Sequence, residues 1–380
     1  MNGVRVIVGV LAVFLSCEAE EIWSGRGLML REEGTVPILF VSGTPEEMGR
    51  QHGTLAAEEV RQSYQRVLLV AGGYLYLKDD WFFDRIQEVE KRTGNVLPAR
   101  FLRECDAMSE AAGLTRKQGR EINLFPEMFH CSGVALRGKA TVGGKVVHAR
   151  VLDYMRDIGL ERSALVQVFL PDGYHAWLSI GFAGFNGTVT AMNEKGLAMG
   201  EIGGHGEGKW DGLPMSFLMR RVMEECGTVQ DAIRLIRSVP LTCGYYYVLS
   251  DAGGDLAALD AKAGEPLCVL RPGDAHPLLR ETLEDGVYVT NPKRQETLLS
   301  RIRENFGRID SKRMEEIIRQ PVAMRSNLHN AIFEPQNLDV SFAYCDKSHT
   351  ACDRPYRKLN LRDLLSTYRD KLSRRQPDEK

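Results

Sequence analysis

The spacing of apolar and polar positions predicts a chain that begins with strands and then turns mostly helical as far as residue 130. Residues 22–42 have the apolar texture of strands. A helix follows at Thr44, where threonine, proline and glutamate stand at the N-cap, first and third helical positions of a capping box. Helical spacing continues to about Val70, and a second start of this kind at Thr115 leads to a helix that ends near Asn123.

From residue 131 onward the pattern changes to strands. Apolar and β-branched runs bounded by turn residues predict strands at 145–154, 163–170, 175–182, 187–200 (a pair), 245–249, 255–260, 287–290, 330–333 and 340–344. Helices are expected at 214–225, 229–237 and 295–306 and in the C-terminal tail. Two groups of strands flanked by helices predict an α+β fold in which two sheets lie between helical layers.

Composition and charge narrow the class of protein. The chain has 380 residues, of which 43% are hydrophobic and 26% charged, and this balance is typical of a folded globular protein. The formal net charge is −2, and lysine and arginine are spread along the chain. No basic patch favours nucleic acid, so we expect no nucleic-acid partner.

The N-terminus predicts export. Residues 1–19 have the form of a signal peptide, with Arg5 before an apolar run from Val6 to Leu15 and small residues after it. The run is shorter than the roughly 20 apolar residues that cross a bilayer. A buried first strand is the alternative. Lipid attachment at Cys17 is a third interpretation, and it is the only one that places the protein on a membrane. We expect a periplasmic or extracellular protein, with a lipoprotein as the variant form.

The cysteines and histidines do not predict a metal site or a cofactor. Cysteine occurs at positions 17, 105, 131, 226, 243, 268, 345 and 352. No CxxC pair is present, so a zinc ribbon or a thioredoxin-like site is not supported. In an oxidising compartment the close candidates for disulfides are Cys345 with Cys352 and Cys226 with Cys243. Removal or lipidation of Cys17 leaves an odd number of cysteines and therefore at least one free thiol.

One segment carries the residues for nucleophilic chemistry. Cys131 lies in the run Phe-His-Cys-Ser-Gly and precedes a strand that contains Arg150 and Asp153. Arginine is permanently cationic and favours thiolate over thiol. Residues three apart on a strand point to opposite faces, so both side chains reach one site only if the strand bends or ends between them. A structural ion pair is the alternative interpretation of Arg150 and Asp153.

If the chain is cut between His130 and Cys131, Cys131 needs no separate residue as its general base. A free α-amine has a pKa of about 7.7–8, so it can take and return a proton near neutral pH. The terminal amine is then a general base on the same residue as the nucleophile. The thiol itself can make the cut by attacking the carbonyl before it. The plainer interpretation is a cysteine that is simply buried or disulfide-bonded.

Several motifs together resemble a known family. They are VSGTPEEMGRQHG at 41–53, Gly113-Leu114-Thr115, Cys131-Ser132, Arg150-x-x-Asp153, MNEKGL at 192–197 and YVTN at 288–291. In this order and spacing they resemble the acyl-CoA:6-aminopenicillanic acid acyltransferase family (peptidase C45). Its members are cysteine N-terminal-nucleophile hydrolases, related to choloylglycine hydrolases and acid ceramidase. The similarity covers nearly the whole chain after the leader.

The resemblance implies a four-layer αββα sandwich and autocatalytic cleavage at His130–Cys131. One domain would then consist of a mostly helical segment, 20–130, and a catalytic segment, 131–380, associated as a heterodimer. Arg150 would tune the sulfur and Asp153 would hold the new amine. Asn291 would bind the oxyanion, although capping of the helix that begins near Pro292 explains it equally well.

The chain also departs from the family. Bile-salt hydrolases carry a further oxyanion asparagine where this chain has Gly203, so bile-salt specificity is not implied and a backbone N–H is expected in its place. The family's second arginine is not placed by the sequence.

The resulting functional hypothesis is an amidohydrolase or acyltransferase that acts on linear N-acyl bonds of small molecules through a thioester on Cys131. Two alternatives stay open: a phospholipase B-like ester hydrolase on the same fold, and an unprocessed binding protein without catalysis. The sequence does not identify the acyl chain or the amine partner.

Overall fold

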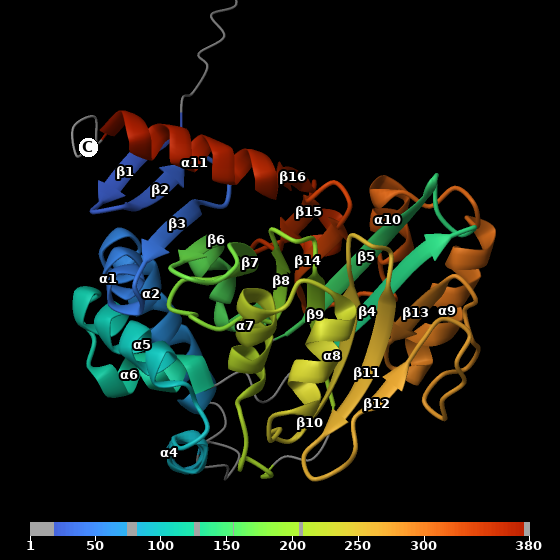
Figure 1. Ribbon diagram of the computed structural model, residues 1–380, viewed down its shortest axis with the longest axis horizontal. Helices are drawn as coiled ribbons and strands as arrows, with labels where there is room; N and C mark the ends of the chain where they lie inside the picture. Colours follow the sequence, from blue (N-terminus) through green and yellow to red (C-terminus); the bar gives the residue numbers. More distant parts are fainter. Residues whose placement is uncertain (1–18, 74–81, 125–129, 155, 205–207, 376–380) are drawn as a thin grey trace, which may run out of the picture.

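Two β-sheets lie face to face in the protein, and helices cover their outer faces (Figure 1). The computed structural model describes residues 19–73, 82–124, 130–154, 156–204 and 208–375. The predicted signal peptide, including Cys17, lies outside the described residues apart from its last position.

The larger sheet, sheet A, has ten strands in the order β1-β2-β3-β6-β7-β8-β9-β10-β11-β12. Their bounds are β1 Glu20–Ser24, β2 Gly27–Arg31, β3 Ile38–Gly43, β6 Ala164–Pro171, β7 Trp177–Phe182, β8 Thr190–Asn193, β9 Ala198–Gly203, β10 Gly244–Ser250, β11 Leu256–Lys262 and β12 Cys268–Leu270. Neighbouring strands are antiparallel except for β3 and β6, which pair in parallel.

The smaller sheet, sheet B, has six antiparallel strands in the order β13-β4-β5-β14-β15-β16. Their bounds are β13 Gly286–Val289, β4 His130–Gly138, β5 Gly144–Asp153, β14 Asn327–Glu334, β15 Asp339–Tyr344 and β16 Arg357–Asn360. The hairpin of β4 and β5 lies in this sheet, so the predicted nucleophile and the Arg-x-x-Asp motif are on paired strands.

The helices occupy the segments between and after the strands. They are α1 Pro45–Leu55, α2 Ala57–Tyr64, α4 Phe82–Thr93, α5 Ala99–Ala111, α6 Arg116–Leu124, α7 Met215–Glu225, α8 Val229–Arg237, α9 Pro292–Glu304, α10 Ser311–Ile317 and α11 Leu361–Arg375. A π-helical turn, η1 Gln65–Ala71, follows α2, and short 3₁₀ turns lie at η2 Arg156–Ile158, η3 Leu160–Ser163 and η4 Ala351–Asp353.

The predicted helix starts are confirmed at atomic detail. Thr44 caps α1 and forms the expected capping box with Glu47. Thr228 caps α8 in the same way, with Asp231 as its partner. The helix expected at 295–306 begins earlier, at Pro292, which agrees with the interpretation of Asn291 as its cap. The strands β12 and β16 and the helix α10 were not predicted.

The layers follow from which strand faces are apolar. On the outer face of sheet B, Val134, Val151 and Ile332 belong to one core cluster with Leu298 and Ile302 of α9. In Figure 1, α7 and α8 lie over the opposite, outer face of sheet A. The inner faces of the two sheets pack on each other. The fold is the predicted α+β four-layer αββα sandwich.

The segment before residue 131 is built into sheet A. Strand β3 pairs with β6 from Ile38–Val166 to Gly43–Pro171. The C-terminal helix α11 closes over the same strands, where the Tyr368 ring stacks on Phe40 at 5.2 Å between ring centroids. The two segments on either side of the predicted cut therefore share one sheet.

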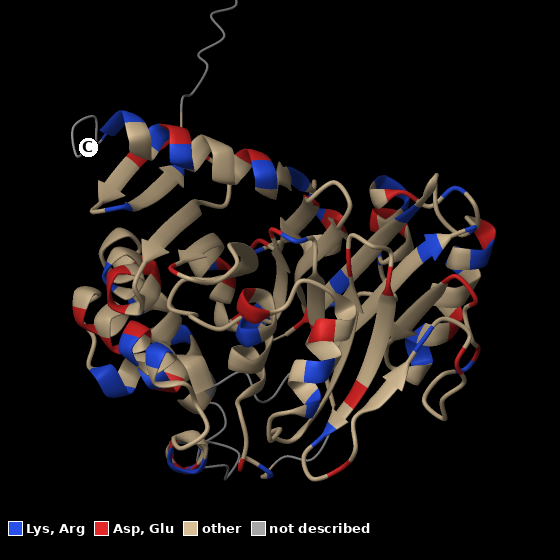
Figure 2. Cartoon of the chain, in the orientation of Figure 1, with Lys and Arg blue, Asp and Glu red and all other residues tan. Residues whose placement is uncertain are grey.

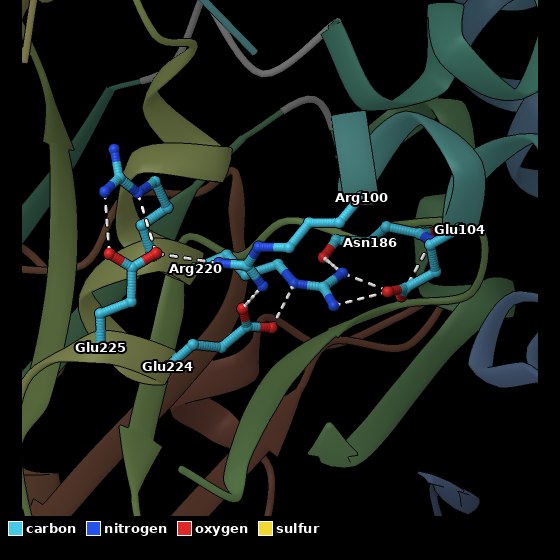
Figure 3. Close-up of polar contacts among 7 residues, drawn as sticks. Arg100, Glu104, Asn186, Arg220, Glu224 and Glu225 are labelled. Carbon is cyan, nitrogen blue, oxygen red and sulfur yellow. Dashed lines mark hydrogen bonds and ion pairs between the residues drawn. The ribbon is translucent and has the colours of Figure 1, made fainter. Parts of the chain in front are cut away.

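A buried ion-pair network joins α5 to α7 (Figure 3). The Arg220 guanidinium lies 2.6 Å from Glu104 Oε2 and 2.7 Å from Glu224 Oε1, and all three side chains are almost fully buried. Arg220 also donates to the Asn186 carbonyl at 2.7 Å. Burial raises the pKa of Glu104, although the charge of Arg220 acts in the opposite direction. Removing Arg220 would leave Glu104 buried with only the amide of Asn186 as a partner, whereas Glu224 would keep its ion pair with Arg100.

Other charged residues lie mainly on helices and loops, with both signs interspersed (Figure 2). Of the helices in the described ranges, none is long and apolar enough to cross a membrane. Within the same ranges, no three His, Cys, Asp or Glu side chains are grouped so that they could hold a metal ion. None of the seven described cysteines forms a disulfide, so the pairs suggested for Cys345–Cys352 and Cys226–Cys243 are absent.

Candidate active site

Cys131 and Arg150 lie on the same face of sheet B. Cys131 stands opposite Leu152 in the β4–β5 ladder, and Gly133 stands opposite Arg150. Residues directly opposite each other share a face, and so do residues two apart on a strand. Cys131 and Arg150 therefore share a face. This face is the inner one, because Gly133 lies against Ile202 and Val248 of sheet A. This register places the sulfur of Cys131 and the side chain of Arg150 on one side of sheet B, as the sequence analysis expected.

Two glycines allow the sheets to approach closely at this point. A methyl group at Gly133 would lie 2.9 Å from side-chain carbons of both Ile202 and Val248 in sheet A. A methyl group at Gly200 would lie 2.7 Å from Cδ of Arg150. Both distances are shorter than carbon atoms tolerate, so a side chain at Gly133 would displace Ile202 and Val248, and one at Gly200 would displace the stem of Arg150.

Arg150 is fully buried and paired with a glutamate that the sequence analysis did not identify. Its Nη2 lies 3.3 Å from Oε2 of Glu201, which is also fully buried. Its Nε donates to the carbonyl of Val189 at 3.4 Å. Glu201 follows the MNEKGL motif by four residues, in the apolar strand β9. The sequence signal that could have identified Glu201 is a charged residue within an otherwise apolar strand.

Asp153 is the last residue of β5, so the strand does not end between Arg150 and Asp153 and their side chains point to opposite faces. It stands opposite His130, on the face away from Arg150. Its Oδ2 lies 2.5 Å from Nη1 of Arg294, and its Oδ1 accepts the backbone N–H of Met324 at 2.9 Å. Burial raises the pKa of Asp153, while the Met324 and Arg294 contacts act in the opposite direction. Arg150 and Asp153 do not form an ion pair with each other at this site.

Arg294 is another arginine of the candidate site, and it was missed from the sequence. Besides Asp153, its Nη2 donates to the carbonyl of Cys131 at 3.5 Å, and its Nη1 donates to that of Val322 at 3.0 Å. It lies in the first turn of α9, three residues after Asn291. Arg294 stands outside the motifs that carry the resemblance, so these motifs offered no reason to select it.

Asn291 caps α9, and it also lines the cavity beside Cys131. Its Oδ1 accepts the backbone N–H of Lys293 at 3.1 Å. The cap uses the acceptor of the amide group, whereas oxyanion binding would use the Nδ2 donors. The two roles proposed for this residue are therefore compatible.

The thiol of Cys131 is not activated in the uncut chain. Burial raises its pKa to about 12, and this effect exceeds the opposite effect of the positive charge of Arg150. The charges of Glu201 and Asp153 raise the pKa further. At neutral pH the sulfur is therefore a neutral thiol.

A cavity of about 530 Å³ opens beside the sulfur. Its size is that of a pocket for a small organic ligand. The wall is formed by Cys131, Ile202, Gly203, Gly204, Tyr246, Leu259, Asp260, Leu270, His276, Leu278, Leu279, Val289, Thr290, Asn291, Pro292, Lys293, Arg294, Pro321 and Met324. The structure thus brings Cys131 and Asn291 to one cavity and includes Gly203, where the family pattern departs. Arg150 and Asp153 are not among the residues that line the cavity.

Of the predicted cleavage pair, the structure describes the backbone of both residues. His130 begins β4, where it pairs with Asp153. The preceding residues 125–129 lie outside the described residues.

Comparison with known proteins identifies the family of the chain. The family model of the acyl-coenzyme A:6-aminopenicillanic acid acyl-transferases matches residues 143–348, more than half of the chain. The chain belongs to this family of cysteine N-terminal-nucleophile hydrolases. The matched region contains Arg150, Asp153, Glu201, Asn291 and Arg294, and it begins after Cys131.

Individual relatives are distant. Protein dcd1B of Dictyostelium discoideum is 22% identical over 343 residues, which are 81% of this chain and 68% of that protein. The N-acylethanolamine-hydrolyzing acid amidase of Rattus norvegicus is 21% identical over 182 residues, 44% of this chain and 49% of the amidase. The solved structure of the Caenorhabditis elegans ortholog of that amidase covers 60% of this chain and all of its own, with 18% identity and a TM-score of 0.46.

Proposed function

We propose that the protein is a self-cleaving cysteine amidohydrolase or acyltransferase that acts on linear N-acyl bonds through a thioester intermediate. The observation that carries this proposal is the position of Cys131. It lines the cavity and lies on the same face of sheet B as the buried Arg150. Membership of a family named for acyl transfer supports the reaction class, and the similarity to an acid amidase supports an amide as substrate.

Activation begins with the thiol of Cys131, which attacks the carbonyl carbon of His130. The peptide C–N bond breaks, the nitrogen takes a proton, and the acyl group of His130 passes to the sulfur. Water then hydrolyses this thioester, which leaves a carboxylate on His130 and restores the thiol. The product is a free amine on Cys131, at the residue whose carbonyl Arg294 contacts. In this proposal Asp153, which Arg294 and Met324 hold in position, orients the new amine.

Catalysis uses the sulfur and the free amine nitrogen of Cys131. The amine takes the thiol proton, and the sulfur attacks the carbonyl carbon of the substrate. The oxyanion of the tetrahedral intermediate accepts from Nδ2 of Asn291, and the wall at Gly203–Gly204 supplies backbone for a second donor. The amine then returns the proton to the leaving nitrogen, and the C–N bond breaks. Water, or an acceptor amine in the transferase variant, releases the acyl group from the sulfur.

Export completes the proposal. The N-terminal leader supports a protein that works outside the cytoplasm, with Cys17 as the site of lipid attachment in the lipoprotein variant.

Matched substrates test the reaction class. Purified protein should hydrolyse an N-acyl amide faster than background, and Cys131→Ala should abolish this activity, whereas Cys226→Ala, at a buried cysteine that does not line the cavity, should not. An ester of the same acyl chain distinguishes an esterase. Preference for the ester with no amide cleavage contradicts the proposal, and so does equal activity of Cys131→Ala.

A further inference from the structure

Asp260 belongs to a row of residues that leads across sheet A away from the nucleophile. Ile202 of β9 stands opposite Tyr246 of β10, and Tyr246 stands opposite Asp260 of β11. Paired residues share a face, so the three side chains lie in a line on the inner face of the sheet. All three line the cavity that contains Cys131.

The carboxylate of Asp260 is buried and only half satisfied. The residue is 6% exposed. Its Oδ2 lies 3.0 Å from Nζ of Lys262 and 3.8 Å from Nε2 of His276. Its Oδ1 is buried and accepts no hydrogen bond from any part of the chain that the structure describes. A buried acceptor without a donor carries an uncompensated desolvation cost, and in a cavity wall a ligand can supply that donor.

We propose that Asp260, Tyr246 and His276 form a subsite that binds a hydrogen-bond donor of the substrate, remote from the carbonyl that Cys131 attacks. This inference rests on the proposed function. The expected donor is a hydroxyl or N–H group, because Lys262 already pairs with the negative charge of the carboxylate. We name these three residues the Asp260 subsite.

The register of the sheet sets the distance between the two ends of the substrate. Neighbouring strands lie about 4.8 Å apart, so Asp260 is roughly 10 Å along the sheet from Ile202. Ile202 in turn lies against Gly133, two residues from Cys131. The walls near the Asp260 subsite are apolar, with Leu259 and Leu270 among them. The substrate class is therefore an amide with an extended apolar chain that ends in a hydroxyl or N–H group.

Matched pairs of amides test this specificity. The two members of a pair have the same scissile amide and the same chain length, and end in a hydroxyl or in a methyl group; a series of lengths covers the estimated span. At the best length the unaltered protein should prefer the hydroxyl compound about tenfold or more in kcat/KM, because a buried acceptor rejects a ligand that leaves it unpaired. Equal kcat/KM values across the whole series would overturn the subsite.

Variants connect the preference to the residue. Asp260→Leu should remove the preference, and Asp260→Asn, which keeps the shape of the side chain, should weaken it. Asp255→Asn is the matched control, because Asp255 lies on the same β10–β11 hairpin, pairs with Arg271 and does not line the cavity. A full preference in both Asp260 variants would contradict the assignment.

A binding measurement separates this proposal from the proposed function. Cys131→Ala cannot turn over the amides, so calorimetry on this variant measures their affinity alone. Tighter binding of the hydroxyl compound, with no hydrolysis by the unaltered protein, would support the subsite and contradict the amidase. Hydrolysis without discrimination in either experiment would support the amidase and contradict the subsite.

Discussion

Charged groups beside Cys131 act on the pKa of its thiol in opposite directions. The positive charge of Arg150 lowers this pKa, and the negative charge of Glu201 raises it. Glu201→Gln should therefore shift the pH dependence of thiol alkylation to lower pH, and Arg150→Met should shift it to higher pH. The measurement is the rate of iodoacetamide labelling of Cys131 against pH, resolved by peptide mapping.

Peptide mapping is needed because Cys268 is partly exposed and will also react. Arg156→Met, an arginine at the protein surface that donates to the carbonyl of Lys347, is the control and should leave the labelling profile of Cys131 unchanged. Shifts of the same sign in the Arg150 and Glu201 variants would rule out this electrostatic account.

Asn291 offers a test that separates its two roles. Aspartate caps helices as well as asparagine does but lacks the Nδ2 donors, so Asn291→Asp should retain stability and lower kcat by roughly 10²–10³-fold. Asn291→Ala should lose activity and, in addition, about 1 kcal/mol of stability. Thermal unfolding and amide hydrolysis measure the two effects. An Asn291→Asp variant with unchanged kcat would restrict the residue to capping.

At the scale of elements, the ion-pair network between α5 and α7 stabilises the layer that covers sheet A. Arg220→Met leaves Glu104 buried without its cation, whereas Glu224 keeps its ion pair with Arg100, and the change should cost about 3–5 kcal/mol of unfolding free energy. Among the residues that the structure describes, the neighbouring Arg221 forms an ion pair only with the partly exposed Glu225, so Arg221→Met should cost about 0–1 kcal/mol. Denaturant unfolding of the two variants measures the difference.

The pH dependence of the Arg220 variant has a definite sign. Burial already raises the pKa of Glu104 in the folded protein, and loss of Arg220 raises it further. A carboxyl with a raised folded-state pKa favours folding below its unfolded pKa, and this contribution is lost as the pH rises through the folded value. The destabilisation should therefore be smaller at about pH 4 than at pH 7. A larger cost at the acidic pH would contradict this interpretation.

Most elements could be predicted from the sequence because their signals are local. The capping residues Thr44 and Thr228 mark helix starts through contacts three residues away, and strands such as β5 show as apolar runs. The missed parts depend on long-range contacts. Strand β12 has only three residues, 268–270, and exists through its pairing with β11.

The site was predictable in part for the same reason. Cys131, Arg150, Asp153 and Asn291 stand in short motifs, so the resemblance selected them. Arg294 approaches Asp153 across 141 residues of sequence, and no local pattern records such a contact. The resemblance likewise gave no reason to select Asp260, because its free oxygen becomes significant only beside a cavity assembled from several segments.

At the scale of the whole molecule, the predicted cut should not separate the two segments. Residues 20–130 contribute β1, β2 and β3 to sheet A, and β3 is hydrogen-bonded to β6 of the other segment. The two chains should therefore elute together in gel filtration under native conditions and separate only in denaturant. Separation in native buffer would contradict the shared sheet.

The central claim concerns the nitrogen of Cys131, which serves as the general base only when it is a free amine. N-terminal sequencing of active, purified protein, together with its intact mass, tests this most directly. We predict a chain that begins at Cys131, and its absence from a Cys131→Ala preparation. An active preparation that contains only the uncut polypeptide would contradict the account.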